Sequence, residues 1–331
     1  MAIIDRTGAE VLIPEENARE ILQAVPEQSV AMRLMRRLPD MGTKVRNLPV
    51  LSSLPMASFV NGDTGLKPTT DMGWDKVILT AEEIATIVVI SENVLDDSDY
   101  DIWANVRPRL TEAIGAAFDK AVFLGTGAPA TFPTALVPGA VAHGNVVTLD
   151  DETPLYQQLL GEGGMIAMVE EDGYVPNAYV GAIQMRSKLR GTVDNNGLPI
   201  FTRQAPYAQG VRGKAGFELD GSDIFFPPTD VFSEEDAMLL GGDWNQAVWA
   251  IRTDITTKLL SEAVITDANG KVLINLAQQD SVALRVVFRA GWALANPVNR
   301  YNATAATRYP FAVLKKAAAA GGNDGGEGGG N

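Results

Sequence analysis

Residues 88–103 read VVISENVLDDSDYDIW, an apolar run followed by four aspartates and the start of a longer periodic segment. Alternating carboxylates are typical ligands of a calcium loop. A loop counted from the second aspartate would have Ile102 where a sharp turn needs glycine, and Pro108 where the ion needs a bidentate glutamate. We therefore predict a structural role, in which Asp99 or Asp101 caps the following helix and the other carboxylates lie at its positive end.

The segment after the aspartates predicts one long helix. Its apolar residues recur at spacings of three and four, as on one helix face, and Gly125 can end the helix. Pro108 either kinks the helix or marks the start of its regular part. The predicted apolar face consists of Trp103, Val106, Leu110, Ala113, Ala117, Ala121 and Leu124.

The segment before the aspartates predicts strands. EEIATIVVIS reads as a buried strand, and before it KVRNLPVL and WDKVILTA alternate as strands do. These two flank VNGDTGLKPTTDMG, which is rich in turn residues, so a projecting hairpin is expected between residues 43 and 80. A two-stranded hairpin has too little apolar surface to be stable alone, and it must pack on something else.

The rest of the chain predicts an arm and a mixed region. Residues 1–42 form the arm, with a short amphipathic helix at residues 15–24. Residues 150–275 alternate helical and strand patterns, with LLGGDWNQAVWAIR as a hairpin or strand, and this indicates a sheet flanked by helices. The glycine-rich residues 316–331 cannot offset their ordering entropy and are expected to be disordered.

The segment SVALRVVFRAGWALANP predicts one further strand. Apolar residues alternate with arginines, which is typical of a half-buried strand. The apolar face would carry Val282, Leu284, Val286 and Phe288, and the opposite face Arg285 and Arg289.

Composition excludes several classes of protein. The chain of 331 residues has a formal net charge of −14, which argues against tight binding to nucleic acid. It has no cysteine, hence no disulfide or thiolate metal site. No apolar run reaches the roughly 18–20 residues of a membrane span, and the N-terminus lacks a signal pattern. We expect a soluble protein in the cytoplasm where it is made.

Catalytic and cofactor motifs are missing. The single histidine, His143, reads as a surface-loop residue, so histidine triads are nearly excluded. GTGAPA follows a helix instead of preceding one, and GVRGKAG lacks the spacing of a phosphate loop. We therefore predict no catalytic residue, no cofactor and no enzyme activity. Segments that are unstable alone are typical of subunits that complete their cores against neighbours, which indicates an assembly protein.

The order of these segments resembles a known family, the tailed-bacteriophage major capsid proteins of the Hong Kong 97 type. The resemblance covers residues 43–315 and depends on order and spacing, because each motif is short. Its motifs are VILTAEEIATIVVISENVLDDSDYDIW, FLGTG, NAYVG, DNNGLPIF, GGDWNQAVWAIR, DSVALRVVFRAGWALANP and RYPFAVLK.

The resemblance implies an α+β architecture with named parts. These would be an N-terminal arm (1–42), an extended loop that crosses a neighbouring subunit (43–80), a peripheral domain with a long spine helix (81–150 and, for its C-terminal strand, 276–315), and an axial domain (151–275), followed by the tail (316–331). Contacts between subunits would then involve Lys67, Trp74 and Lys76 of the extended loop.

The resemblance also implies function and partners. The chain would assemble with itself, as pentamers and hexamers, into the icosahedral shell of a virion that encloses double-stranded DNA, without sequence-specific binding and without a membrane. Assembly would occur in the cytoplasm of the host bacterium, and scaffolding, portal and decoration proteins are further possible partners. Encapsulins share this fold and are an alternative, and an α/β enzyme is a more remote one.

Some members of the resembled family crosslink their shells between a lysine of the extended loop and an asparagine beside a catalytic glutamate. Here the loop offers Lys67 and Lys76. The partner region reads Asp280, Ser281 and Val282, and Arg289 falls where the glutamate is expected. The resemblance therefore does not extend to the crosslink.

Overall fold

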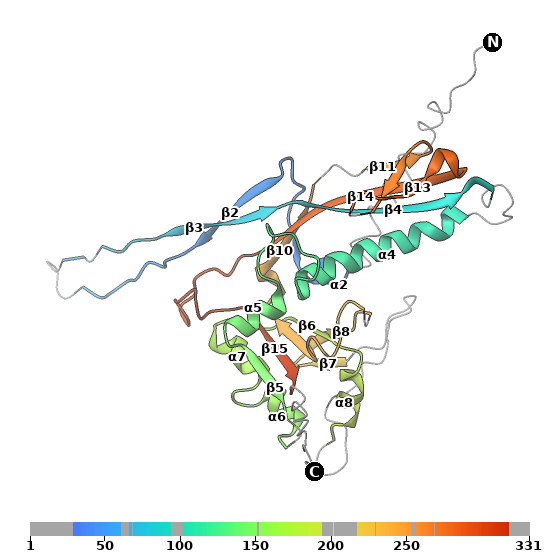
Figure 1. The fold of residues 1–331 in the computed structure, drawn as a ribbon. Helices are drawn as coiled ribbons and strands as arrows, with labels where there is room; N and C mark the ends of the chain where they lie inside the picture. The colour runs from blue at the N-terminus through green and yellow to red at the C-terminus, as the bar shows by residue number, and fades with distance from the viewer. Residues whose placement is uncertain are drawn as a thin grey trace, which may run out of the picture.

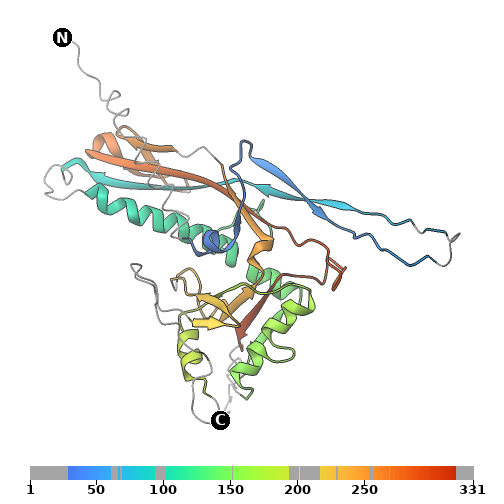
Figure 2. The same ribbon diagram turned by 180° about the vertical axis from the view of Figure 1, so that it is seen from behind.

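The computed structural model describes residues 29–317 except 61–65, 68, 94–101, 151, 194–200, 202–216, 229, 253–255 and 268. It has an elongated upper layer, a hairpin that projects from this layer, and a lower body below it (Figures 1 and 2). Helix and sheet are mixed, as predicted. The predicted helix at 15–24, the aspartates at 96–101 and nearly all of the glycine-rich tail lie outside the described residues.

The helices alternate with strands along most of the chain. The α-helices are α2 (Val30–Leu34), α4 (Ile102–Phe123), α5 (Leu136–Ala142), α6 (Leu155–Leu160), α7 (Met165–Glu171) and α8 (Met185–Gly191), with short 3-10 helices η3 (Trp244–Gln246) and η4 (Leu276–Gln278). Among these described helices, none has both the length and the apolarity to cross a membrane.

The first sheet forms the upper layer and is centred on β14 (Ser281–Leu294). One edge of β14 pairs with β4 along residues 281–290, and the other edge is shared by β11 and β10. The parallel strand β1 extends the sheet beyond β10. Their bounds are β1 (Arg36–Arg37), β4 (Glu82–Ser91), β10 (Ala247–Ile251) and β11 (Thr256–Leu260).

The burial of two strands differs from the prediction. β14 is a central strand and is buried on both faces, with only Arg285, Arg289 and Leu294 partly exposed, because it also contacts η4 and the strand β3 (Trp74–Thr80). β4 is paired within the described chain only to β14 and is half-buried, with Ile87 45% exposed. The alternation of apolar residues predicted both strands correctly, but the elements that pack on each strand determine how much of each face is buried.

Helix α4 packs beneath the first sheet (Figure 1). Leu110 and Ala121 of the predicted face are buried, but Ile114 and Phe118 lie in the core in place of Ala113 and Ala117, which are exposed. The larger side chains at i, i+4 spacing remove more apolar surface from water than the alanines do, so they set the rotation of the helix. Pro108 lies inside the helix, and Gly125 follows its end with φ 79°, as expected of a helix-ending glycine.

The second sheet forms the lower body, with the strand order β5-β15-β9-β6-β8-β7. Helices α6, α7 and α8 contribute to the core on one face, and α4 and α5 to the core on the other, which confirms the predicted sheet flanked by helices. The bounds are β5 (Val146–Leu149), β6 (Ala178–Gly181), β7 (Phe217–Leu219), β8 (Ser222–Phe225), β9 (Leu239–Gly242) and β15 (Phe311–Lys316).

The two sheets do not follow the domain ranges expected from the sequence. LLGGDWNQAVWAIR forms two strands in different sheets, since β9 pairs with β6 and β15 while β10 pairs with β14. β15, expected with the first sheet, pairs with β5 and β9 in the second. The small pair β12 (Val264–Thr266) and β13 (Val272–Asn275) precedes β14.

A buried polar network fixes the segment that leads from β14 to β15. The carboxylate of Asp172 accepts hydrogen bonds from Asn145 Nδ2 (2.9 Å), Asn302 Nδ2 (2.8 Å) and the Tyr309 backbone N–H (2.9 Å). Arg308 is 2% exposed, and its guanidinium donates to Asn302 O at 2.7 Å. Satisfied buried networks of this kind hold one local geometry.

Gly291 of β14 allows a close approach to the end of β3, and this gives a first prediction. A Cβ atom there would lie 3.0 Å from the Leu79 side chain and still closer to the Thr80 carbonyl oxygen. We expect Gly291→Ala to lower the free energy of unfolding of the subunit by about 2 kcal/mol through overpacking, measured by urea denaturation. Gly42→Ala is the matched control, because nothing lies within 4 Å of its Cβ position. Equal stability of the two variants would contradict the prediction.

Candidate assembly surface

The hairpin of β2 (Val45–Leu51) and β3 (Trp74–Thr80) is present as predicted and projects from the first sheet (Figure 1). Residues directly opposite in register share a face, so Trp74, Lys76 and Ile78 lie on the same side as Leu51, Pro49 and Asn47. On this exposed face Trp74 is 62% and Ile78 50% exposed. Large apolar side chains along a projecting strand indicate a surface that is covered by another chain.

The tip of the hairpin, residues 52–73, exposes further apolar side chains that the sequence reasoning did not single out. Phe59 and Leu66 are fully or almost fully exposed, and Met56 is 76% exposed. The sequence does contain a signal for this exposed surface, because large apolar residues stand in an otherwise polar, turn-rich segment. Lys67 is exposed in this tip, outside the strands, whereas Trp74 and Lys76 lie together on β3.

The hairpin is anchored at its base and along one strand. At the base Leu79 is fully buried in a cluster with Met41, Val248 and Ala293. Farther along, Val298 N–H donates to Leu51 O at 3.0 Å and Arg300 Nη2 to Pro55 O at 3.2 Å. This anchoring fixes the direction in which the hairpin leaves the subunit.

A polar contact near the same base joins the start of β4 to the loop after α4. Lys44 Nζ lies 3.1 Å from Glu82 Oε1, and the Thr131 hydroxyl donates to the same oxygen at 2.9 Å. The Thr131 hydrogen bond, helped by Lys44, holds the pKa of the Glu82 carboxyl below its usual value.

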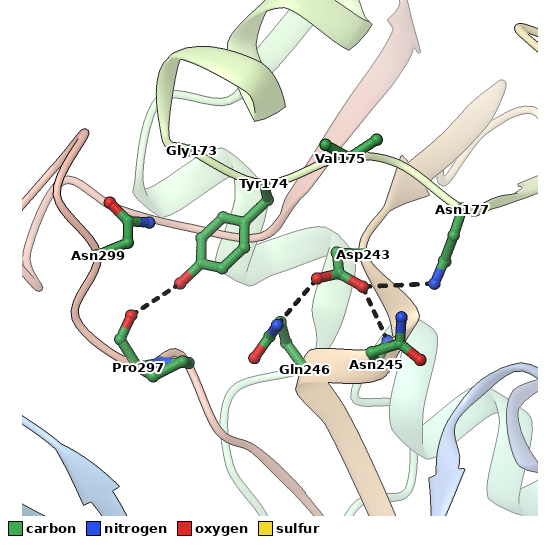
Figure 3. A pocket seen from close by; sticks show the side chains of 9 residues that line it. All are labelled: Gly173, Tyr174, Val175, Asn177, Asp243, Asn245, Gln246, Pro297 and Asn299. Carbon is green, nitrogen blue, oxygen red and sulfur yellow. Dashed lines mark hydrogen bonds between the residues drawn. The ribbon is translucent and has the colours of Figure 1, made fainter.

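An open cleft of about 530 Å³ lies beside the passage from β9 to β10 (Figure 3). Its polar groups are engaged with one another: Asp243 accepts from Gln246 Nε2 (2.9 Å) and the Asn245 N–H (3.1 Å), and the Tyr174 hydroxyl donates to Pro297 O (3.1 Å). Asp243 thereby caps η3. The cleft contains no base with a nucleophile beside it, so its arrangement is that of a structural joint.

The other candidate residues have different outcomes. Asp99 and Asp101 lie outside the described residues, so their capping role stays a prediction. His143 lies in the turn after helix α5, as its C-cap, and is half-buried instead of free on the surface: its ring stacks on the Tyr309 ring at 4.6 Å, and its Nδ1 lies 2.8 Å from Gly139 O. Within the described ranges, no three histidine or acidic side chains gather as metal ligands would.

The residues considered for a crosslink lie along β14. Ser281 and Val282 are buried at its start, and Arg289 forms a short ion pair with Glu83 of β4, with Nη2 2.7 Å from Oε2. Arg289 is thus the cross-strand partner of a glutamate on the neighbouring strand.

Comparisons with known proteins agree with an assembly role. The model of the phage capsid family matches residues 9–299. The major capsid protein of Staphylococcus phage 80alpha is 23% identical over 287 residues, which are 83% of this chain and 79% of that protein.

Solved structures give the same result. A chain from Microbacterium phage Oxtober96 is 35% identical, with 87% of this chain and 91% of that chain covered and a TM-score of 0.72. A chain from Mycobacterium phage Bobi is 28% identical, with 96% and 100% covered and a TM-score of 0.73. Because the family model spans most of the sequence, the chain belongs to the phage capsid family.

Proposed function

We propose that this chain is the major capsid protein of a tailed phage and that its copies form the shell of the head. The observation that carries the proposal is the family match over residues 9–299, together with an exposed apolar hairpin that a single subunit leaves uncovered. The encapsulin alternative is not supported, because the matching family and the curated relative are those of phage capsids. A catalytic role has no support either, and we propose that the chain turns over no substrate.

The finer architecture fits the Hong Kong 97 type. In this assignment the hairpin is the extended loop, the first sheet with α4 as its spine helix is the peripheral domain, and the second sheet is the axial domain. Domain boundaries then follow sheet membership, so that β10 and β11 are peripheral and β5 and β15 axial, and the separate pair β12–β13 is assigned with the peripheral strands β11 and β14 that flank it in sequence. The N-terminal arm would precede α2.

Partners follow from this assignment. Axial domains would meet around fivefold and sixfold axes as pentamers and hexamers, in an icosahedral shell around double-stranded DNA. The fold is shared with the capsid of a native GTA particle computed with C5 symmetry, at 16% identity and a TM-score of 0.58. The net charge of −14 suits a container that releases its DNA. Scaffolding, portal and decoration proteins, and assembly in the host cytoplasm, are part of the same proposal.

Negative-stain electron microscopy of the chain expressed alone tests the proposal. We expect closed shells, sheets or tubes, which sediment far faster than a free subunit. Nuclease-resistant DNA inside particles from infected cells would support the phage function over a cargo compartment. Small discrete oligomers under all conditions would contradict the proposal.

The absence of a crosslink is a second prediction. Arg289 is paired with Glu83, and an arginine cannot act as the base that the lysine–asparagine reaction needs. We therefore expect particles that are boiled in denaturant to run as a single monomer band on a gel. A ladder of covalent multimers would contradict this, and mass spectrometry would then identify the joined residues.

A further inference from the structure

Charge is unevenly distributed over the lower body. From residue 121 to residue 185 the sequence has seven acidic residues and no lysine or arginine. Helix α8 then has three basic residues and no acidic one. The sequence between α8 and β7 continues this bias with three basic residues against one acidic, all four outside the described residues.

The acidic residues lie on the side of β5, α6 and α7. Four exposed glutamates there have no ion-pair partner in the described part of the chain: Glu152, Glu162, Glu170 and Glu171. Glu170 and Glu171 end helix α7, where the helix dipole disfavours negative charge, and the last turn has no basic residue. An unfavourable charge that no described residue of its own subunit neutralises is suited to a partner in another subunit.

The basic residues lie on the opposite side of the body. Met185 and Leu189 bury the inner face of α8, which leaves Lys188 and Arg190 exposed. The Arg186 guanidinium lies 5.3 Å from the centre of the Phe226 ring, just after β8, so α8 belongs to the β8–β7 edge. The neighbouring β7–β8 hairpin carries the acidic residues Glu218, Asp220 and Asp223. The positive charge at this edge is therefore confined to helix α8 and does not extend over the hairpin.

The two charged surfaces lie toward opposite edges of one sheet, because α6 contacts β5 and α7 contacts β15 and β9, whereas α8 contacts Phe226 just after β8. The outermost strands β5 and β7 are five strand intervals apart, or about 24 Å at about 4.8 Å each. Figures 1 and 2 both show α6 and α7 on one side of the body and α8 on the other, with the body narrowing away from the first sheet. Unlike flanks on one body favour head-to-tail association, and such contacts form a ring where the rotation between neighbouring copies closes.

We propose that the lower body of one copy contacts the next copy around a ring through these flanks, with Lys188 and Arg190 of α8 facing the glutamates of α6 and α7. The inference rests on the proposed function and names the surfaces that meet. Exposed ion pairs contribute little energy each, but complementary charge sets register and rejects wrong partners. A ring repeats the same contact at every subunit, so a charge reversal weakens every contact in the ring.

Charge reversal and charge exchange test the inference in the full-length chain. One variant carries Lys188→Glu and Arg190→Glu, a second carries Glu170→Lys and Glu171→Lys, and a third combines all four changes. We expect each of the first two to lower the yield of sedimentable shells about tenfold. The exchanged variant should recover most of the yield, and at about 0.5 M salt all differences should shrink, since screening then acts within a few ångströms.

Two controls separate this contact from folding and from net charge. Far-UV circular dichroism should be unchanged by the α7 variant, and its thermal unfolding should occur at the wild-type temperature or slightly above it, because lysines at the end of α7 interact favourably with the helix dipole. Lys258→Glu with Lys271→Glu alters net charge as much as the α8 variant does, on exposed residues of β11 and of the β12–β13 turn, and should assemble normally.

The outcomes are distinct. If wild-type chains form no shells, the proposed function itself fails. If wild-type chains assemble and the two reversals assemble equally well, or the exchanged variant is worse than both, the flank contact is wrong. Equal loss in the Lys258 and Lys271 control would attribute the effect to net charge and would also overturn the inference.

Discussion

Replacing Trp74 and Ile78 together by serine is expected to raise the subunit concentration needed for shell formation about 30-fold, while the subunit stays folded. Both side chains lie on the exposed face of β3, and neither belongs to a core cluster. Their exposure in one subunit, 62% and 50%, means that their removal leaves the hairpin core of Leu79 intact. The replacement should therefore weaken only the contact in which a second copy covers these two side chains.

The expected size follows from the area that the neighbour can cover. Full burial of a large apolar side chain contributes about 1.5–3 kcal/mol, and these two side chains are already about half covered in the subunit. Losing both should therefore weaken each contact by about 2 kcal/mol, which is about 30-fold in a dissociation constant. The subunit concentration at which shells form should rise by about the same factor.

Light scattering against subunit concentration measures this threshold, and electron microscopy identifies the product. Asp75→Ser is the matched control, because Asp75 is exposed on the opposite face of the same strand. We expect its threshold to equal that of the wild type. A double variant that assembles at the wild-type concentration would exclude the exposed face as a contact between copies.

The hairpin could be predicted from sequence because its evidence is local. Two alternating strands and a turn-rich tip between them determine the pairing of residues 45–51 with residues 74–80. Burial of Leu79 at the base determines which face of β3 is covered. The register of the strands then places Trp74 and Ile78 on the opposite, exposed face. The exposed Phe59 and Leu66 were not predicted, because the sequence of one chain does not show which exposed apolar side chains a neighbouring copy covers.

The division into two sheets could not be predicted, because it depends on pairing between distant segments. β9 and β10 are separated only by η3, yet one pairs with β15 and the other with β14. Alternation specifies a strand without specifying its partner. The face of α4 was predicted only in part for a related reason: alanines also fit the spacing of three and four, but the bulkier Ile114 and Phe118 are buried in place of Ala113 and Ala117.

Asp119 of α4 is the second residue whose replacement should have a large effect. It is 2% exposed, and its carboxylate accepts hydrogen bonds from Ser29 Oγ (2.5 Å), Val30 N–H (2.9 Å) and Ala31 N–H (3.0 Å). These groups form the N-terminal end of α2, so one side chain of the long helix holds the segment that follows the N-terminal arm. Asp119→Ala would leave these buried donors unsatisfied and should lower the free energy of unfolding by about 3 kcal/mol.

The dependence on pH distinguishes this carboxylate from a neutral polar group. Burial raises the pKa of Asp119 from 3.8 to about 6, even though the hydrogen bonds from Ser29, Val30 and Ala31 act in the opposite direction. The folded subunit therefore binds this proton more tightly than the unfolded chain does, and the contribution of Asp119 to the free energy of unfolding falls as the pH rises from about 4 to about 6.

Asp119→Asn keeps one acceptor and removes the titration, so it is the matched variant for a pH series. Urea denaturation of wild type and variant at several pH values gives the difference between their free energies of unfolding, in which all other titrating groups cancel. Between about pH 7 and about pH 4 this difference should shift by about 2 kcal/mol in favour of the wild type, because the wild-type carboxyl becomes neutral in its buried site. A difference that stays constant would mean that the carboxyl titrates alike in the folded and unfolded chains. A shift in favour of the variant would mean that the hydrogen bonds from α2 outweigh burial, and that acid weakens the attachment of α2 to α4.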